Sequence, residues 1–334
     1  MIAILPDGLL PFIASAGWEG AHVDPLPGDA SFRRYFRLTL GDPARGGASA
    51  MLMHAPPPQE NPQPFLHAAR WLTENHLRAP HVLAQNAAEG WVLLEDFGDD
   101  RVRDWLDANP GDEAAIYAAA LAPLIVLSRI SAGPFPPYDL AVYRREVALL
   151  TEWYAPAAGL NVDAPGYMAA WDQVLLPLLE RQGEGITILR DYHAENIMLL
   201  DGSLTAQGLL DFQDALVGHP AYDLVSLLQD ARRDVSPATE AAMLDHYLAA
   251  TDLPRDAFLA DYAILGAQRT AKIVGLFVRL WQRDGKSRYL ALIPRVWALL
   301  ERDLQHPALA PVAAWFDANI PAPLRAAHGG SFAA

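Results

Sequence analysis

Three polar side chains in the second half of the chain have types and spacing that suit one kind of chemistry. Asn196 follows Asp191 by five positions, and Asp211 follows Asn196 by fifteen. Phosphoryl transfer from ATP needs little covalent help from a protein, but it does need a carboxylate beside the acceptor hydroxyl and oxygen ligands for Mg²⁺. We therefore predict that Asp191 accepts the hydroxyl proton and that Asn196 and Asp211 bind the metal.

Apolar segments that read as strands lead into these residues. Gly185–Leu189 precedes Asp191, and Gly208–Leu210 precedes Asp211; short apolar runs of this kind are typical of buried strands. An Asp-x-x-x-x-Asn match by itself is more typical of a loop cap. The chemical interpretation therefore depends on these strands and on the motifs elsewhere in the chain.

Four further motifs occur in order along the sequence. They are Ala30-Ser31-Phe32-Arg33-Arg34-Tyr35-Phe36-Arg37, Leu93-Leu94-Glu95-Asp96, Asp211-Phe212-Gln213-Asp214-Ala215, and Tyr222-Asp223-Leu224-Val225-Ser226-Leu227-Leu228. With them the chain resembles the kinase superfamily, and more closely the aminoglycoside-phosphotransferase-like small-molecule kinases. Within that family it is most similar to the bacterial anomeric kinases for N-acetylmuramate and N-acetylglucosamine that serve cell-wall recycling. The resemblance covers most of residues 28–300.

The resemblance implies a fold and an activity. The fold would be a two-lobe, protein-kinase-like α/β (α+β) fold, with a small β-rich lobe at residues 1–97 that ends in the hinge, and a larger helical lobe at 98–334. The activity would be ATP- and Mg²⁺-dependent phosphorylation of the anomeric hydroxyl of N-acetylmuramate and/or N-acetylglucosamine, giving the sugar 1-phosphate in peptidoglycan recycling. The residue chemistry alone supports only ATP-dependent phosphorylation of a hydroxyl.

The resemblance also assigns roles to further residues. The nucleotide would be bound by Ser31, Arg33 and Arg34 in the first loop and strand, and by Glu95, Asp96 and Phe97 in the hinge, where backbone groups contact adenine. Asp223 lies in the first turn of the predicted helix that follows Asp211–Ala215. It would hold the loop that contains Asp191 and Asn196, the catalytic loop, by accepting hydrogen bonds from its backbone amides.

The sequence departs from the kinase pattern at two positions. The strand Ala50–His54 has no lysine to hold the α- and β-phosphates. We expect Arg34, or less readily Arg33, to replace it, because a guanidinium can bind phosphate through two hydrogen bonds. Leu189 stands where kinases usually have histidine, which orients the loop and does not react.

Candidate substrate residues lie close in the sequence to Asp191 and Asp211, and in a long predicted helix that contains residues 268–286. Arg269, Lys272, Arg279 and Arg283 fall on one side of that helix at ~100° per residue. Arg269 or Arg279 would suit the lactyl carboxylate of N-acetylmuramate; alternatively, this cationic stripe pairs with acidic helices of its own lobe. His193 and Asp214 either contact substrate or serve as a loop hydrogen-bonding group and a cap.

Composition restricts the classes of partner. The chain has 334 residues, 52% of them hydrophobic, no cysteine and a net charge of −15, which argues against nucleic acid and against anionic membranes. The apolar segment Glu113–Arg129 predicts a buried helix rather than a membrane span. We expect a cytoplasmic enzyme with a small amino-sugar substrate and no obligate protein partner, and a frayed end after Ile320.

Two rival interpretations remain open. An aminoglycoside or amino-alcohol kinase would share every catalytic residue, although the cationic stripe disfavours such cationic substrates. The missing lysine and Leu189 also allow a non-catalytic, nucleotide-binding pseudokinase. The presence of Asp191, Asn196 and Asp211 together argues against the pseudokinase.

Overall fold

The chain divides into two compact units in the computed structural model, which describes residues 5–27, 32–42 and 47–332. The first unit comprises Met1–Asp112 and Glu195–Asp214, and the second comprises Glu113–Ala194 and Ala215–Ala334. These units do not coincide with the lobes 1–97 and 98–334, which stay a prediction. The difference arises because the hairpin after residue 195 packs with the first unit, where the Leu199 N–H donates to Asp100 O and the Leu209 N–H to Arg78 O.

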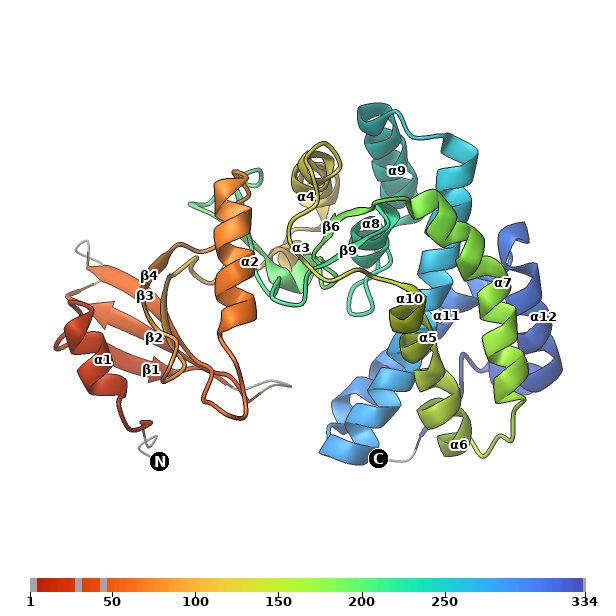
Figure 1. Cartoon of the computed structure of the whole chain (residues 1–334), viewed down its shortest axis with the longest axis horizontal. Coiled ribbons are helices and arrows are strands. Elements are labelled where there is room, and N and C mark those ends of the chain that lie inside the picture. Colours follow the sequence, from red (N-terminus) through yellow and green to blue (C-terminus); the bar gives the residue numbers. More distant parts are fainter. Residues whose placement is uncertain (1–4, 28–31, 43–46, 333–334) are drawn as a thin grey trace. The chain divides into compact units, whose positions relative to one another are not determined.

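The first unit is built on an antiparallel sheet with strand order β1-β2-β3-β5-β4 (Figure 1). The strands are β1 (His22–Pro25), β2 (Arg34–Leu40), β3 (Ala48–His54), β4 (Val82–Asn86) and β5 (Trp91–Glu95). The strand Ala50–His54 of the sequence analysis is confirmed, and in the structure it begins two residues earlier, at Ala48. β1 and β4 carry no continuous apolar alternation, and the sequence analysis did not identify them.

Strand register explains the core of this unit. Phe36 lies opposite Leu52, and Leu52 lies opposite Leu93. Because residues directly opposite each other on neighbouring strands point to the same side of a sheet, all three share one face. On that face they pack against Leu9, Phe12 and Ile13 of helix α1 (Leu9–Ser15), which Figure 1 shows beside the strands. Burial of this apolar set is the main stabilising contribution to the sheet.

The rest of the first unit consists of two helices and a hairpin. Helices α2 and α3 span Gln63–Glu74 and Val102–Ala108, and strands β7 and β8 span Ile197–Leu199 and Gln207–Leu209. The hairpin pairs Ile197 with Leu209. This register brings the residue before β7 close to the residues after β8, which is what positions Asn196 near Asp211.

The second unit is almost entirely helical. Its helices are α4 (Glu113–Leu127), α5 (Leu140–Leu149), α6 (Ala155–Ala157), α7 (Ala164–Gln182), α8 (Ala221–Leu228), α9 (Pro237–Thr251), α10 (Arg255–Asp284), α11 (Ile293–Asp303), α12 (Ala310–Asn319) and α13 (Ala322–Ala326). A short antiparallel pair, β6 (Ile186–Ile188) with β9 (Leu216–Gly218), supports the start of the catalytic loop. The mixed α/β fold class is as the sequence predicted.

Helix α10 is the central helix of this unit. It packs against α5, α8 and α11, as Figure 1 shows, and also against a π-helical turn, Leu150–Tyr154, that continues α5. The contact with this turn requires a glycine, because a Cβ on Gly275 would lie 2.2 Å from the carbonyl of Leu149. Helix α10 ends at Gly285, whose φ of +68° is the left-handed conformation common after a helix.

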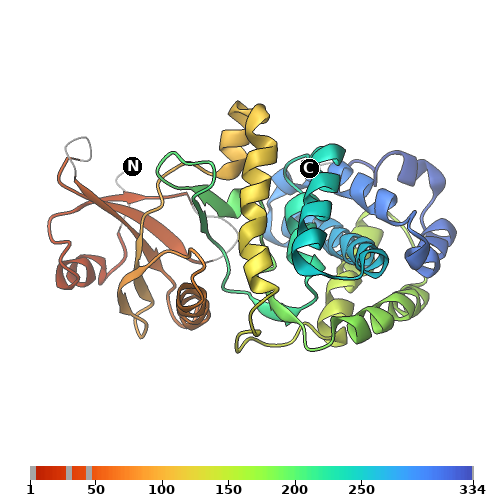
Figure 2. The ribbon, with the colours of Figure 1, turned by 90° about the horizontal axis from the view of Figure 1, so that it is seen from above.

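Two expectations about exposure need correction. The stretch Pro110–Leu127 is long and apolar enough to cross a membrane by length and composition alone, but α4 within it packs against α9, side by side in Figure 2. Only one face of α4 is buried, because its other positions are mostly small alanines that need no cover. Within residues 321–332, which the structure describes, the chain is not frayed, since α13 forms there and Gly329 O accepts the hydroxyl of Tyr154 at 2.9 Å.

Candidate active site

The two predicted metal ligands lie together at one end of the β7/β8 hairpin. Nδ2 of Asn196 is 3.4 Å from Oδ2 of Asp211, and the Leu210 N–H donates to the backbone O of Asn196 at 2.9 Å. Both residues belong to the first unit. Their side-chain oxygens are therefore within reach of a single ion.

The backbone at Asp211 has an unusual conformation. Its φ is +58°, in the left-handed region that residues other than glycine seldom adopt. The next residue, Phe212, is fully buried and stacks on Phe65 with ring centroids 5.1 Å apart, and Nε2 of Gln213 donates to Oδ1 of Asp211 at 2.7 Å. Burial of the phenyl ring thus holds the exposed carboxylate in place, and strain of this kind is concentrated at functional sites.

The donor set at this position fits magnesium. The described residues contain no group of three or more histidine, cysteine or acidic side chains that could hold a metal by themselves. Mg²⁺ in phosphoryl-transfer enzymes is bound through one or two protein oxygens together with substrate phosphates. One amide and one carboxylate side chain match this requirement.

The structure separates the two arginines that were candidates for phosphate binding. Arg34 pairs in register with His54 on the α1 face of the sheet, where His54 stacks on Trp91. Burial, followed by the charge of Arg34, lowers the pKa of His54. Arg34 therefore lies on the face that carries the core of the sheet.

Arg33 and the predicted metal ligand Asp211 both lie near Tyr35. Burial raises the pKa of Tyr35, while the charge of Arg33 lowers it and that of Asp211 raises it, which means that both charged groups are close to the tyrosine hydroxyl. Nε of Arg33 is 3.5 Å from Oε2 of Glu60. Ser31, the remaining candidate in this loop, lies outside the described residues.

The predicted hinge is fixed by two arginines that the sequence analysis did not assign to it. Arg78 donates to both carboxylate oxygens of Glu95, at 2.7 and 2.5 Å, and lowers its pKa. Nε of Arg37 is 2.8 Å from Oδ2 of Asp96, and the same guanidinium contacts Asp99 at 2.7 Å. Arg37 is thereby committed to the hinge, and no pattern in the sequence indicated these long-range pairs.

Phe97 is enclosed by the same unit. The guanidinium of Arg78 lies 4.8 Å from the centre of its ring. A Cβ on Gly208 of β8 would lie only 2.4 Å from the ring, so glycine is required for this approach. The backbone N–H of Glu95 donates to His81 O at 2.9 Å. The side chains of Glu95, Asp96 and Phe97 thus all contact arginines of the protein itself.

The catalytic loop is anchored in the second unit by Asp223. This buried carboxylate accepts the N–H of Leu189 at 2.6 Å and the N–H of Arg190 at 2.8 Å. Burial raises its pKa to about 7, although the two N–H groups and the positive charge of Arg269 act in the opposite direction. This geometry supports the predicted role of Asp223, and it fixes the backbone immediately before Asp191.

Asp191 itself is partly exposed. Its backbone N–H donates to Leu189 O at 2.9 Å, and its own carbonyl accepts the His193 N–H at 3.1 Å. Its negative charge raises the pKa of Asp223 and that of Lys272, so both groups are electrostatically close. A half-exposed carboxylate on a backbone fixed in this way can accept a proton from a bound hydroxyl.

His193 is buried rather than presented to substrate. Nε2 of its ring is 3.1 Å from a guanidinium nitrogen of Arg232. Burial lowers its pKa to about 3, and the charges of Arg232 and Arg269 add to the effect of burial, while that of Asp230 opposes it. The ring is therefore neutral at physiological pH and does not present a charged acid to the site.

The other candidate substrate residues are dispersed. Arg269 is only 4% exposed, inside the unit near His193 and Asp223. Burial and the neighbouring Arg283 lower the pKa of the half-buried Arg279. Asp214 is exposed. The helix was predicted correctly, but the stripe does not form one continuous cationic surface.

Comparisons with known proteins agree with this geometry. A family model described as the phosphotransferase enzyme family matches residues 22–259. An N-acetylmuramate/N-acetylglucosamine kinase of Caulobacter vibrioides is 38% identical, covering 94% of this chain and 96% of that protein. A protein of the same name from Pseudomonas aeruginosa is 37% identical, covering 91% of each chain.

A solved structure supports the fold alone. The crystal structure of a choline/ethanolamine kinase family protein from Mesorhizobium loti has a TM-score of 0.59 at 15% identity, covering 90% of this chain and 93% of that one. The predicted fold class and the resemblance to small-molecule kinases are both confirmed. The chain belongs to the phosphotransferase enzyme family.

Proposed function

We propose that this protein is an ATP-dependent kinase that phosphorylates the anomeric hydroxyl of N-acetylmuramate and/or N-acetylglucosamine. The γ-phosphoryl group is transferred from ATP to the sugar oxygen, and the products are ADP and the sugar 1-phosphate. The relatives of that name, which match nearly the whole chain, support the substrate class. The family supports the phosphotransferase chemistry.

The observation that carries the proposal is the anchored loop at Asp191. Asp223 holds the two preceding backbone N–H groups, so the Asp191 carboxylate is positioned before substrate binds. Asp191 accepts the proton of the attacking hydroxyl as the phosphoryl group is transferred. Positioning of this kind accounts for most of the catalysis that a phosphotransferase requires.

Asn196 and Asp211 would hold the divalent metal, which we propose to be Mg²⁺. When bound, the ion neutralises charge on the ATP phosphates. The left-handed backbone at Asp211 and the buried ring of Phe212 fix the carboxylate for this purpose. No rearrangement of the hairpin is then needed when the nucleotide arrives.

We assign phosphate binding to Arg33 in preference to Arg34. The proximity of Arg33 and Asp211 to the same tyrosine hydroxyl supports this choice, as does the position of Arg34 on the opposite face. Glu60 beside Arg33 would fix the guanidinium, in the way that an acidic partner orients a phosphate-binding cation. Adenine would contact backbone groups of the hinge at Glu95 and Phe97, while Asp96 shapes the turn through Arg37.

The substrate carboxylate is better matched by Arg279 than by Arg269. Arg269 lies beneath the catalytic loop, where its charge favours the ionised form of Asp223. His193 is also buried, which argues for a structural role of its ring. Asp214 remains a candidate sugar contact because it is exposed. Arg279→Ala should then impair N-acetylmuramate more than N-acetylglucosamine, which lacks the carboxylate; equal loss with both sugars would remove the assignment.

A panel of acceptors tests the proposed function. ADP release would be followed with N-acetylmuramate, N-acetylglucosamine, choline and an aminoglycoside, and kcat/KM compared. We expect the two acetylated amino sugars to be preferred, consistent with a cytoplasmic step of peptidoglycan recycling that needs no nucleic acid, membrane or protein partner. Preference for choline or the aminoglycoside would favour the other small-molecule kinases, and ATP binding without any turnover would favour a pseudokinase.

A further inference from the structure

Arg190, the residue directly before Asp191, is held at three points. Its N–H donates to Asp223 at 2.8 Å, its carbonyl accepts the hydroxyl of Ser226 at 3.1 Å, and its guanidinium donates to Oε1 of Glu146 at 2.5 Å. Its φ is +70°. A residue other than glycine keeps this conformation only where its surroundings fix it.

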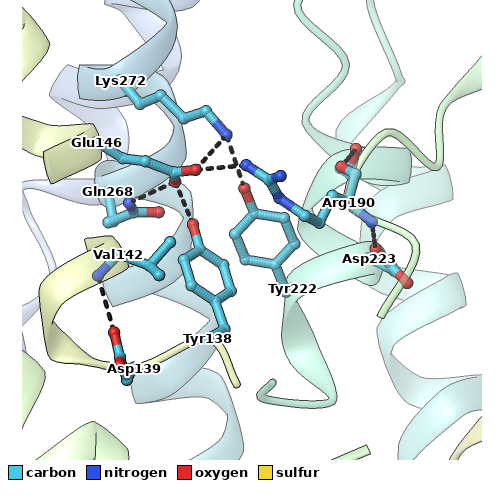
Figure 3. Close-up of polar contacts among 10 residues, drawn as sticks. Tyr138, Asp139, Val142, Glu146, Arg190, Tyr222, Asp223, Gln268 and Lys272 are labelled. Carbon is cyan, nitrogen blue, oxygen red and sulfur yellow. Dashed lines mark hydrogen bonds and ion pairs between the residues drawn. The ribbon is translucent and has the colours of Figure 1, made fainter. Parts of the chain in front are cut away.

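Glu146 of α5 is the centre of a buried polar network, shown in Figure 3. Besides Arg190 it accepts Nζ of Lys272 at 3.0 Å, Nε2 of Gln268 at 3.3 Å and the hydroxyl of Tyr138. Its side chain is 7% exposed. Burial by itself raises the pKa of Glu146, but the charges of Lys272 and Arg190 outweigh burial and lower it to about 2.

Two cations therefore share one buried carboxylate. The side chain of Lys272 is 16% exposed, and its Nζ also lies 3.4 Å from the hydroxyl of Tyr222. Beyond Glu146, Asp191 is a further negative group whose charge acts on both Lys272 and Arg190. Lys272 and Arg190 carry two positive charges, and Glu146 carries only one negative charge. The carboxylate of Asp191 is therefore attracted by the positive charge that remains.

The network joins the catalytic loop to the most rigid part of the second unit. Glu146 lies on α5, and Gln268 and Lys272 lie on α10, which packs extensively against α5. Helices packed in this way hold their side chains more accurately than a loop can. Because Glu146 of α5 contacts Arg190, the packed helices restrict the position of Arg190 and of the neighbouring Asp191.

We propose that Glu146, Lys272 and Arg190 form a positioning cluster that holds the Asp191 carboxylate where the acceptor hydroxyl is deprotonated. The proposal rests on the proposed function, because it assigns this cluster to the same proton transfer. None of the three residues needs to touch the substrate. Their effect is exerted through the backbone of Arg190 and through the charge beside Asp191.

Two variants test the cluster, and a third is a matched control. Arg190→Gly removes the side-chain anchor but favours the same φ, because glycine adopts positive φ readily; it also leaves Glu146 paired with Lys272. The double variant Glu146→Gln/Lys272→Met removes one negative and one positive charge together, which keeps the net charge of the cluster unchanged while it breaks the ion pair between Glu146 and Arg190. The control is Arg144→Ala. Arg144 lies on α5, as Glu146 does, and makes a more exposed ion pair with Asp172 of α7.

We expect kcat to fall roughly 100-fold in both test variants, since small misplacements of a catalytic group have effects of this size. KM for ATP should stay within about twofold of the parent, because the nucleotide-binding residues are in the other unit and are not altered. Arg144→Ala should retain the parental kcat. Parental kcat in Arg190→Gly, or equal changes in kcat and in KM for ATP in both variants, would overturn the proposal.

Hydrogen exchange supplies a readout that does not depend on the substrate. Peptides covering residues 186–194 should exchange faster in both test variants than in the parent, while peptides from β7 and β8 are unchanged. Unchanged exchange in 186–194 would contradict the positioning role even if no acceptor were turned over. Faster exchange in a protein that phosphorylates no sugar would leave the cluster standing and remove only the proposed function.

Discussion

Replacement of Asp223 by asparagine should reduce stability and activity together. In the parent the carboxylate accepts two backbone N–H groups, at 2.6 and 2.8 Å. The amide that replaces this carboxylate has one oxygen and would turn its own NH₂ group toward the second N–H. The loss is one charge-assisted hydrogen bond, about 1.5–3 kcal/mol, and one buried donor without an acceptor, about 1–3 kcal/mol.

These contributions sum to about 2.5–6 kcal/mol, which is an upper bound because the burial that raises the pKa of Asp223 also penalises its charge. At an unfolding entropy of ~2.1 cal/mol/K per residue, the fall in Tm is at most roughly 4–9 °C for a chain of this size. Thermal unfolding should be measured at pH 8, above the pKa of about 7, so that Asp223 is ionised in the parent. The same preparations are then assayed for kcat, which should fall roughly 100-fold as the loop before Asp191 loosens.

Asp163→Asn is the matched control. Asp163 caps α7 by accepting the Gly166 N–H at 2.9 Å, and asparagine caps a helix as well as aspartate does. Its Tm and kcat should stay at the parental values. An Asp223→Asn protein that is inactive yet as heat-stable as the parent would refute the reasoning, as would one that keeps full activity.

Three further predictions follow from the other parts of the site. Arg33→Ala should raise KM for ATP at least tenfold and Arg34→Ala should not; equal effects would return Arg34 to consideration. Asp211→Asn should abolish the increase in Tm that Mg²⁺·ATP gives the parent, because binding to the folded state alone stabilises it; an unchanged shift would exclude Asp211 as a ligand. The pKa of His193 is lowered to about 3, so below pH ~6.5 the unfolded chain binds a proton there that the folded chain does not. The free energy of unfolding should consequently fall as pH drops from about 6.5 toward 3 by more in the parent than in His193→Gln, by urea titration at each pH; parallel profiles would contradict the buried, neutral ring.

Short-range features of the site were accessible from the sequence. The strands before Asp191 and Asp211 lie in short, mostly apolar segments, and the first turn of α8 carries Asp223 at a position typical of an acidic residue. Local patterns of this kind depend on neighbours in the chain. They therefore survive without knowledge of the tertiary contacts.

The pairs that fix the hinge and the catalytic loop were not accessible. Arg37 and Asp96 are separated by 59 positions, and Glu146 and Arg190 by 44. Arginine and glutamate in a sequence are usually interpreted as solvent-exposed, and nothing local distinguishes these from the others. Only the fold brings such residues together.

The cationic stripe shows why a correct helix can still give a wrong surface. The 3.6-residue period placed Arg269 and Lys272 on one side of α10, and the helix is present. Because α10 is surrounded by α5, α8 and α11, the part of that side with Arg269 and Lys272 faces the interior, whereas Arg279 is half-buried and Arg283 is exposed. Periodicity gives the relative angle of two side chains but not what lies opposite them.

The most direct test of the account is a phosphorus NMR spectrum of the purified protein with ATP, Mg²⁺ and N-acetylmuramate, beside the same mixture with the Asp191→Asn variant. The account predicts a sugar 1-phosphate resonance that grows with ADP in the parent and is absent in the variant. A phosphate resonance from another hydroxyl, or an equal 1-phosphate signal from the variant, would contradict the assigned regiochemistry or the assigned base. No new signal with either acetylated amino sugar would contradict the proposed function itself.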